Sequence, residues 1–275
     1  MSDYMDHTER YQLHKLASLL DTFECLMDDK VTGKMKSNED YSNILLQSAG
    51  KASLTLRAML HLCVSGFPDA ALILARQIYE QSIILCFFEQ IKQQPDFEKH
   101  VEDYYADYNL QIAQYNKWQA ENIQNDPKDV SKYQNQIDTI RQNGYSKKKG
   151  PYWWSGYSSF KDIVDFLFAS VNSQFAKHMK ITHLLYMRAC KDVHVSALGN
   201  ALRLGSNPEM CGVDNSAKTT GHGLPLYFAV SSFNLIAYIV FANMNINGEK
   251  LVHELDELSD LYARIDHEEN SEAEK

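Results

Sequence analysis

Arg188 and His194 are the residues of this chain whose types are best suited to chemistry. Both lie in the segment Tyr186–His194, near the end of a strongly apolar helical pattern. Arginine is always charged, and histidine is the side chain that titrates near neutral pH. Burying such groups costs free energy unless partners or a ligand compensate. The segment therefore predicts a site that joins an anion binder to an acid–base group.

The spacing of this pair leaves a second interpretation open. Six residues on an ideal helix correspond to about 600°, so Arg188 and His194 are separated by about 120° around the axis. They share a face only if the helix ends, bulges or meets a partner, whereas His194 does share a face with Tyr186 and Cys190. In the alternative interpretation, Arg188 pairs with Asp192 four residues later and His194 is a hydrogen-bonded residue at the helix end.

Arg76 and Glu80 form a second candidate pair. They are four residues apart in the most apolar helical pattern of the chain, so they share a helix face. One interpretation is an ion pair that orders a helical bundle. The other is functional, because a buried ion pair is weak evidence for stability: Arg76 helps to hold an anion, and Glu80 orients that anion or a catalytic base.

A basic and aromatic loop is the third candidate, and it comprises Lys147, Lys148, Lys149, Trp153 and Trp154. Lysines beside tryptophans could contact phosphates and stack on bases, as in single-strand nucleic-acid binding. The alternative is a solvated lysine run next to tryptophans that fill the core.

Composition excludes several other classes of function. The chain has 275 residues and a net charge of −9, with a pI near 5.6, which disfavours non-specific nucleic-acid binding through a generally basic surface. The five cysteines form no CxxC pair, so no zinc site is expected, and they are typical of reduced thiols in a cytosolic protein. Phosphate-binding, zinc-protease and serine-hydrolase motifs are absent, and we expect no metal or cofactor.

The elements that must position these residues are predicted to be helices. Gly (12) and Pro (6) are sparse, apolar residues make up 44% of the chain, and long helical periodicities fill the space between breakers. We expect an all-α, multi-helix bundle. The predicted helices cover residues 8–30, 37–64, 68–92, 96–123, 126–142, 159–170, 172–196, 224–243 and a last segment to about residue 265.

The predicted organisation is one helical domain over residues 1–265, followed by a charged flexible tail over 266–275. Residues 205–223 show no periodicity and predict a long loop. The segment 224–243 approaches the length of a membrane span, but Ser231, Ser232 and Asn234 favour a buried core helix. The acidic, polar N-terminus shows no signal peptide. We therefore expect a cytoplasmic protein without a membrane contact.

Three short motifs resemble those of a bacterial family of uncharacterised helical proteins that often occur near mobile or defence genes. The matches span about residues 40–200 and keep the family's order. They are the turn Gly66–Ala71 before Arg76-x-x-x-Glu80, then Trp154-Ser155-Gly156, and then a Tyr-Arg…His-x-Ser segment formed by Tyr186, Arg188, His194 and Ser196.

The last motif also looks like the R-x(4–6)-H element of HEPN-type helical domains, many of which are metal-independent RNases that act as dimeric toxins or antiviral effectors. The resemblance implies a HEPN-like bundle of roughly eight or nine helices. It also implies that Arg188 binds the scissile phosphate and that His194 is the general acid–base. The supporting residues would be Arg76, Glu80, Tyr186, Asp192 and Ser196. Five residues separate Arg188 from His194, and Ala189 stands where the commoner form has a polar residue.

Two hypotheses follow. The first is a HEPN-like, metal-independent RNase or toxin in phage defence or stress response, acting on RNA as a homodimer, with a partner protein encoded nearby. The second is a non-catalytic helical module that binds a protein or a small ligand. The second hypothesis predicts that Arg188 is paired internally with Asp192 or Glu80.

Overall fold

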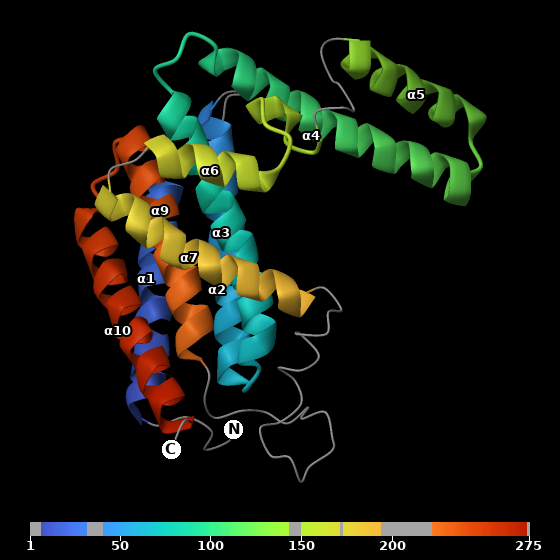
Figure 1. Cartoon of the computed structure of the whole chain (residues 1–275). Helices are drawn as coiled ribbons and strands as arrows, with labels where there is room; N and C mark the ends of the chain where they lie inside the picture. The colour runs from blue at the N-terminus through green and yellow to red at the C-terminus, as the bar shows by residue number, and fades with distance from the viewer. Residues whose placement is uncertain (1–6, 32–40, 143–149, 171–172, 194–221, 274–275) are drawn as a thin grey trace. The chain divides into compact units, whose positions relative to one another are not determined.

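The computed structural model describes residues 7–31, 41–142, 150–170, 173–193 and 222–273 (Figure 1). Within these ranges the chain forms nine α-helices and no strand, so the predicted all-α multi-helix bundle is confirmed. The helices are α1 (His7–Val31), α2 (Tyr41–Val64), α3 (Pro68–Ile91), α4 (Phe97–Gln119), α5 (Pro127–Gln142), α6 (Phe160–Ser170), α7 (Ser173–Val193), α9 (Gly223–Met244) and α10 (Glu249–Ala273).

The turn between α2 and α3 shows why these helices end where the sequence predicts. Gly66 has a φ of 82°, a left-handed conformation that favours glycine. Its N–H donates to Cys63 O at 3.0 Å, and the N–H of Phe67 donates to Leu62 O at 2.9 Å. This pair of bonds is the Schellman motif, which satisfies the last carbonyls of α2. Pro68 then begins α3 at a position where its missing N–H costs nothing.

The last helix is longer than the sequence analysis expected. The predicted helix ends at about residue 265 and is followed by a flexible tail, whereas α10 continues to Ala273. No Gly or Pro follows Gly248, so the chain contains no residue that would stop the helix. Charged residues alone do not end a helix, because their side chains reach water from any exposed face.

The chain divides into two compact units. The first unit comprises Met1–Lys36, Ile44–Cys86 and Asn172–Lys275, and the second comprises Ser37–Asn43 and Phe87–Val171. The division falls within α2 and α3. The single folding domain expected over residues 1–265 stays a prediction.

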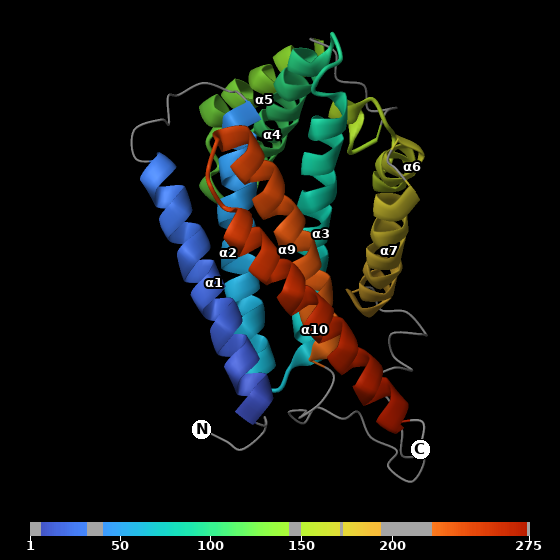
Figure 2. The same ribbon diagram turned by 90° about the vertical axis from the view of Figure 1, so that its left-hand side faces the viewer.

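Helix α9 lies at the centre of the first unit. It runs beside α10, and α1 packs on α10 (Figure 2). The Phe23 ring of α1 meets the Phe233 ring of α9 edge-on, with 4.9 Å between centroids. The hydroxyls of Ser231 and Ser259 bond each other at 2.5 Å, which satisfies two buried polar groups.

Among the residues that the structure describes, two helices, α3 and α9, are long and apolar enough to cross a membrane. In the most apolar window of each, 67% and 78% of the residues respectively are buried inside the structure. Length and composition are weak evidence of a span, because the core helices of soluble proteins have the same properties. The burial of α9 agrees with the core helix predicted for residues 224–243.

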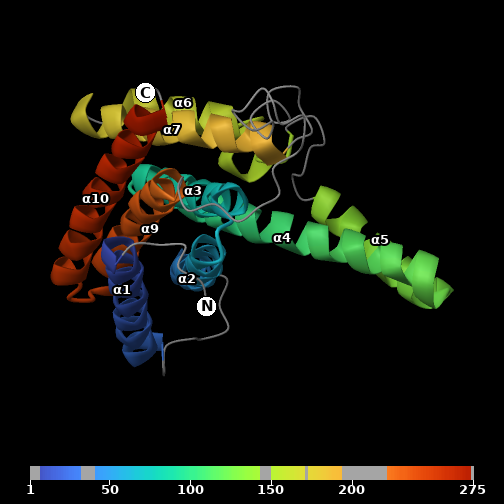
Figure 3. The same cartoon turned by 90° about the horizontal axis from the view of Figure 1, so that it is seen from below.

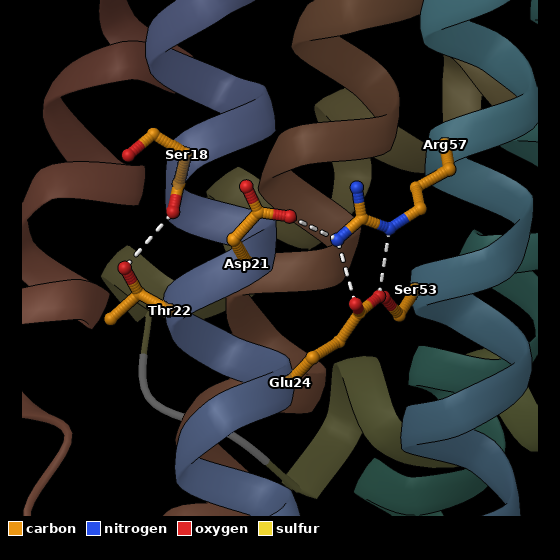
Figure 4. A network of polar contacts seen from close by, with 6 residues as sticks. All are labelled: Ser18, Asp21, Thr22, Glu24, Ser53 and Arg57. Carbon is orange, nitrogen blue, oxygen red and sulfur yellow. Dashed lines mark hydrogen bonds and ion pairs between the residues drawn. The ribbon is translucent and has the colours of Figure 1, made fainter.

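A network of polar contacts joins α1 to α2 within the first unit (Figure 4). Arg57 donates from Nε to Glu24 Oε1 at 2.8 Å, and from Nη2 to Glu24 Oε2 at 2.7 Å and Asp21 Oδ1 at 2.6 Å. Ser53 Oγ donates to Glu24 at 2.5 Å. Hydrogen bonding from Arg57 is the main reason why the pKa of Glu24 lies below its ordinary value. The bidentate geometry fixes the register of the two helices.

The second unit is built on α4 and α5, which run side by side in opposite directions (Figure 3). A π-helical turn, Ala120–Gln124, continues α4. Asp126 then caps α5, because its Oδ1 accepts the N–H of Lys128 at 2.9 Å. The helix predicted for residues 126–142 thus begins at this cap.

Trp154 fills the aromatic core of the second unit. Its ring stacks on Phe88 with 5.5 Å between centroids and 12° between planes, and it meets Phe87 and Tyr104 edge-on. Its carbonyl oxygen accepts the Nδ1–H of His100 at 2.7 Å. The burial of Trp154 holds the segment after residue 150 against α3 and α4.

Candidate functional site

A polar cluster of the first unit joins α3 to α7. Arg76 Nε donates to Glu80 Oε1 at 2.8 Å, and the Tyr186 hydroxyl donates to the same oxygen at 3.1 Å. The side chains of Arg76 and Glu80 are 23% and 29% exposed, so the cluster lies at the margin of the core. The four-residue spacing brings the first pair together on one helix face. Tyr186 comes from a helix 106 residues away in the sequence.

Aromatic rings surround this ion pair. The Arg76 guanidinium lies over the Tyr186 ring, 5.4 Å from its centroid, in a cation–π contact. The His183 ring stacks on the Tyr186 ring, with 5.6 Å between centroids and 19° between planes. Its Nδ1 lies 3.2 Å from the Tyr79 hydroxyl, within hydrogen-bond distance. Tyr79 also packs against Tyr186 and Phe228 of α9, which ties the cluster to the core.

Burial and charge decide the protonation of these groups. Burial raises the pKa of Tyr79. Burial is the largest cause that raises the pKa of Tyr186, and a hydrogen bond with Cys190 and the charge of Glu80 raise it further. Both phenols therefore remain hydrogen-bond donors near neutral pH. For Arg76, burial works to lower the pKa, but the Glu80 carboxylate raises it further and the net direction is upward. The cluster holds a fixed cation and contains no tyrosinate base.

The outward face of α7 has a different character. From Ser173 to Lys191 the sequence contains no Asp or Glu, in a chain of net charge −9. The four basic residues of this stretch are Lys177, Lys180, Arg188 and Lys191. Lys180 and Arg188 are exposed, and between them lie the exposed apolar side chains of Ile181, Leu184 and Met187. This face is a cationic strip that could attract anions.

Arg188 lies on this outward face and not in the cluster. Two residues along a helix correspond to about 200°, so Tyr186 and Arg188 project to opposite sides of α7. Arg188 makes no ion pair with any residue whose side chain the structure describes, Glu80 included. The side chain of Asp192 and the whole of His194 and Ser196 lie outside the described residues. The predicted pairing of Arg188 with Asp192 therefore stays open.

The structure thus brings together three of the predicted supporting residues, Arg76, Glu80 and Tyr186. The ion-pair interpretation of Arg76 and Glu80 is the one that the geometry supports directly.

The predicted nucleic-acid loop needs a correction. Trp153 and Trp154 are 5% and 3% exposed, so neither ring is available to stack on a base. Trp153 Nε1 donates to Asp107 at 2.7 Å, which satisfies its polar group inside the unit. This burial agrees with the alternative interpretation, in which the tryptophans fill the core. Lys147, Lys148 and Lys149 lie outside the described residues.

Sequence reasoning missed two members of the cluster, Tyr79 and His183. A local signal for His183 exists, because it precedes Tyr186 by three residues and Cys190 by seven, the spacing of one helix face. The contact of Tyr79 is tertiary and has no local signal. The absence of acidic residues between 173 and 191 was also readable from the sequence. No group of three or more metal-ligating side chains occurs among the residues that the structure describes.

The fold and this site define an all-α protein with an ordered Arg–Glu–Tyr cluster beside a basic helix. The chain belongs to a family of unknown function, DUF5677, whose model matches residues 42–210, well over half of the sequence. The match includes the cluster and all of α7 and leaves out α1, α9 and α10. Comparisons with curated proteins and with solved structures find no match.

Proposed function

We propose that the protein is a HEPN-like, metal-independent endoribonuclease that acts as a toxin in phage defence or stress response. The observation that supports this proposal most is the outward face of α7, where Arg188 is exposed and is not paired with Glu80. The hypothesis of a non-catalytic module predicts Arg188 paired internally with Asp192 or Glu80. Glu80 instead bonds Arg76 and Tyr186, which favours a role for Arg188 toward an external anion, and the side chain of Asp192 lies outside the described residues.

The chemistry follows from the two residue types. The planar guanidinium of Arg188 binds a phosphate through two parallel hydrogen bonds and stabilises the charge that develops on it. His194 takes the proton of the ribose 2′-OH, whose oxygen attacks the neighbouring phosphorus. The bond from phosphorus to the 5′-oxygen breaks, and that oxygen receives a proton. The products are a 2′,3′-cyclic phosphate and a 5′-hydroxyl, and a DNA strand cannot react because it has no 2′-OH.

The Arg76–Glu80–Tyr186 cluster has a positioning role in this proposal. Tyr186 fixes α7 against α3 through its bond to Glu80. Because Glu80 already accepts two hydrogen bonds, its charge is neutralised within the cluster, and it does not pair with Arg188 on the opposite side of α7. A cytoplasmic location, a homodimer and a partner protein encoded nearby belong to the same proposal.

The test is cleavage of a mixed-sequence RNA in EDTA, with product ends identified by mass spectrometry. We expect Arg188→Ala to lower the rate about 10²–10³-fold and His194→Ala to lower it about 10²–10⁴-fold. The matched control is His253→Ala, whose side chain is 74% exposed on α10, away from the basic face of α7. It should stay close to the wild-type rate.

Two outcomes contradict the proposal. One is a folded wild-type protein that leaves RNA intact, and the other is a His194→Ala variant that cleaves as fast as wild type. Circular dichroism of every variant shows that a lost activity does not reflect unfolding.

A second candidate is a non-catalytic module that binds a protein through α7. The exposed side chains of Ile181, Leu184 and Met187 favour it, at 42%, 60% and 42% exposure. Contiguous exposed apolar groups often mark an interaction surface. This candidate predicts an inactive wild type and loss of partner binding in Leu184→Asp.

A further inference from the structure

Helix α4 is apolar on two opposite sides. One side packs against α5 within the second unit, where Leu110 and Ala113 of α4 meet Ile137 and Ile140 of α5 in a small buried cluster. This contact accounts for the hairpin of the two helices (Figure 3). A single covered stripe would suffice for such a hairpin. The other side therefore needs a separate explanation.

The opposite side carries four large exposed side chains. Tyr108, Ile112, Tyr115 and Trp118 are 55%, 40%, 66% and 56% exposed. On an ideal helix they fall within an arc of about 120°, on the side away from Leu110. We call these four residues the α4 stripe. Single exposed apolar residues are normal on a protein surface, but four in helical register form a patch that marks an interaction site.

The stripe has the same helical phase as the buried face of the first half of α4. Phe97, Val101 and Tyr105 are buried, and Tyr108 and Ile112 continue that face by steps of three or four residues. The sequence thus keeps a core-like pattern beyond the part of α4 that is covered by described residues of this unit. We propose that the α4 stripe is an interface with a second copy of this chain, and this proposal does not rest on the proposed function.

The order of residues in the stripe suits pairing with itself. Tyr108 stands four residues before Ile112, and Tyr115 stands three residues after it. A two-fold axis near Ile112, with the helices antiparallel, brings the two isoleucines together and puts each Tyr108 beside Tyr115 of the second copy. A dimer with two-fold symmetry requires this kind of self-complementary patch.

Charge favours a protein partner over a nucleic acid. The sequence from Tyr108 to Asn116 contains no charged residue, so two copies meet without repulsion at the centre. The charged residues elsewhere on α4 are predominantly acidic: Glu98, Lys99, Glu102, Asp103, Asp107 and Lys117. An acidic helix repels phosphates, although its aromatic rings alone would suit stacked bases. A tyrosine- and tryptophan-rich strip with uncharged neighbours is typical of the centre of a protein interface.

The exposed area is close to what a specific dimer needs. A complete aromatic side chain offers about 150–250 Å², so the exposed fractions of the three aromatics leave roughly 350 Å² per copy. Ile112, together with Ile123 in the π-helical turn (63% exposed), adds roughly 100 Å² by the area equivalent of an aliphatic side chain. Two copies then bury about 900 Å², near the lower limit of about 1,000 Å² for a specific interface. The expected dimer is reversible.

The first test is sedimentation velocity of the full chain over a range of concentrations. Wild type should convert from monomer to dimer as the concentration rises, and Ile112→Glu should raise the dissociation constant at least 100-fold, because it places two like charges at the axis. The matched control is Leu54→Glu, at a side chain that is 70% exposed on α2 and outside the stripe. It should dimerise as wild type does. Circular dichroism confirms that both variants are folded.

The second test locates the axis. In a background with Cys25→Ser and Cys211→Ser, which removes the thiol that is exposed among the described residues and the one outside them, Ile112→Cys should give a disulfide-linked dimer under mild oxidation. Thr139→Cys, an exposed position on α5, should stay monomeric on a non-reducing gel. A residue near a two-fold axis meets its own copy, whereas one away from the axis does not.

Three outcomes overturn the proposal. A wild-type protein that stays monomeric at every concentration excludes a second copy as the partner of the α4 stripe. If Ile112→Glu then lowers the melting temperature, the stripe packs against another part of the same chain. A dimer that survives Ile112→Glu unchanged uses another surface. Equal loss of dimer in Leu54→Glu shows a general effect of added charge.

Discussion

Replacing Glu80 by alanine tests whether the cluster between α3 and α7 stabilises the first unit. One carboxylate oxygen accepts hydrogen bonds from both Arg76 and Tyr186, at 2.8 and 3.1 Å. A hydrogen bond to a charged group contributes about 1.5–3 kcal/mol, and breaking a fully buried ion pair costs about 3–5 kcal/mol. Both side chains of the pair are 23–29% exposed, so water compensates part of the loss. We expect a cost of about 2 kcal/mol in unfolding free energy.

The assay is urea unfolding followed by far-UV circular dichroism, which reports on all helices. All three tryptophans, Trp118, Trp153 and Trp154, belong to the second unit, so tryptophan fluorescence follows that unit separately. The matched control is Glu254→Ala. Glu254 is also 29% exposed, but it pairs with Lys250, which is 91% exposed. A pair of that kind contributes at most about 0.5 kcal/mol.

A double-mutant cycle separates the interaction between Arg76 and Glu80 from the contribution of each side chain alone. Glu80→Met leaves the Arg76 guanidinium without its partner, whereas Arg76→Met with Glu80→Met replaces both charges by apolar groups. Replacing both partners of a partly buried pair costs little, while removing one leaves an uncompensated charge. The double variant should therefore be more stable than Glu80→Met alone. The cycle also needs Arg76→Met alone. The reasoning is refuted if the losses of unfolding free energy in Arg76→Met and Glu80→Met simply add in the double variant, or if Glu80→Ala costs no more than Glu254→Ala.

Three further predictions concern other parts of the molecule. Trp154→Ala should destabilise the second unit by about 3–5 kcal/mol in urea titrations, since it empties an aromatic core site; a cost below about 1 kcal/mol would contradict the packing. The pKa of Glu24 is lowered, mainly by hydrogen bonding from Arg57, so the ionised group stabilises the fold above its ordinary pKa of 4.5. This contribution is lost as the pH falls through the lowered folded pKa, and the stability advantage of wild type over Glu24→Gln should shrink in acid melting curves; a constant difference would argue against it. Burial raises the pKa of the Cys63 thiol to about 12, so iodoacetamide at pH 8 should modify exposed Cys25 and spare Cys63 until urea is added, as read by peptide mass spectrometry.

Local signals predicted the helices well because breakers and caps act locally. Residues 68–92 were expected to be a helix, and α3 runs over Pro68–Ile91, since Gly66 and Pro68 fix its start through backbone geometry alone. The start predicted for the helix over residues 126–142 agrees with α5 for the same reason, because Asp126 caps it locally. The end of α10 was missed because the sequence analysis took charge as a sign of disorder, although no residue in that segment opposes a helix.

The candidate site was predictable only where its contacts are local. Arg76 and Glu80 meet because four residues make one helical turn, and this spacing is visible in the sequence. The bond from Tyr186 to Glu80 spans 106 residues, and no periodicity encodes it. The tryptophans show the same limit. A tryptophan beside lysines is compatible with a surface or a core, and burial by Phe88 and Tyr104 decides for the core.

The two sides of α7 make it possible to separate stability from function. Tyr186 projects toward α3 and holds the helix, whereas Arg188 projects to the exposed side, about 200° away. An exposed side chain without an ion pair to a described residue contributes little to folding, within about 0.5 kcal/mol. Arg188→Ala should therefore leave urea unfolding unchanged, whereas Tyr186→Phe should weaken it. If Arg188→Ala instead destabilises the fold, its guanidinium has an internal partner, and the argument that it is available for phosphate fails. A stable Arg188→Ala protein that has lost RNA cleavage would place the chemistry on the outward face of α7.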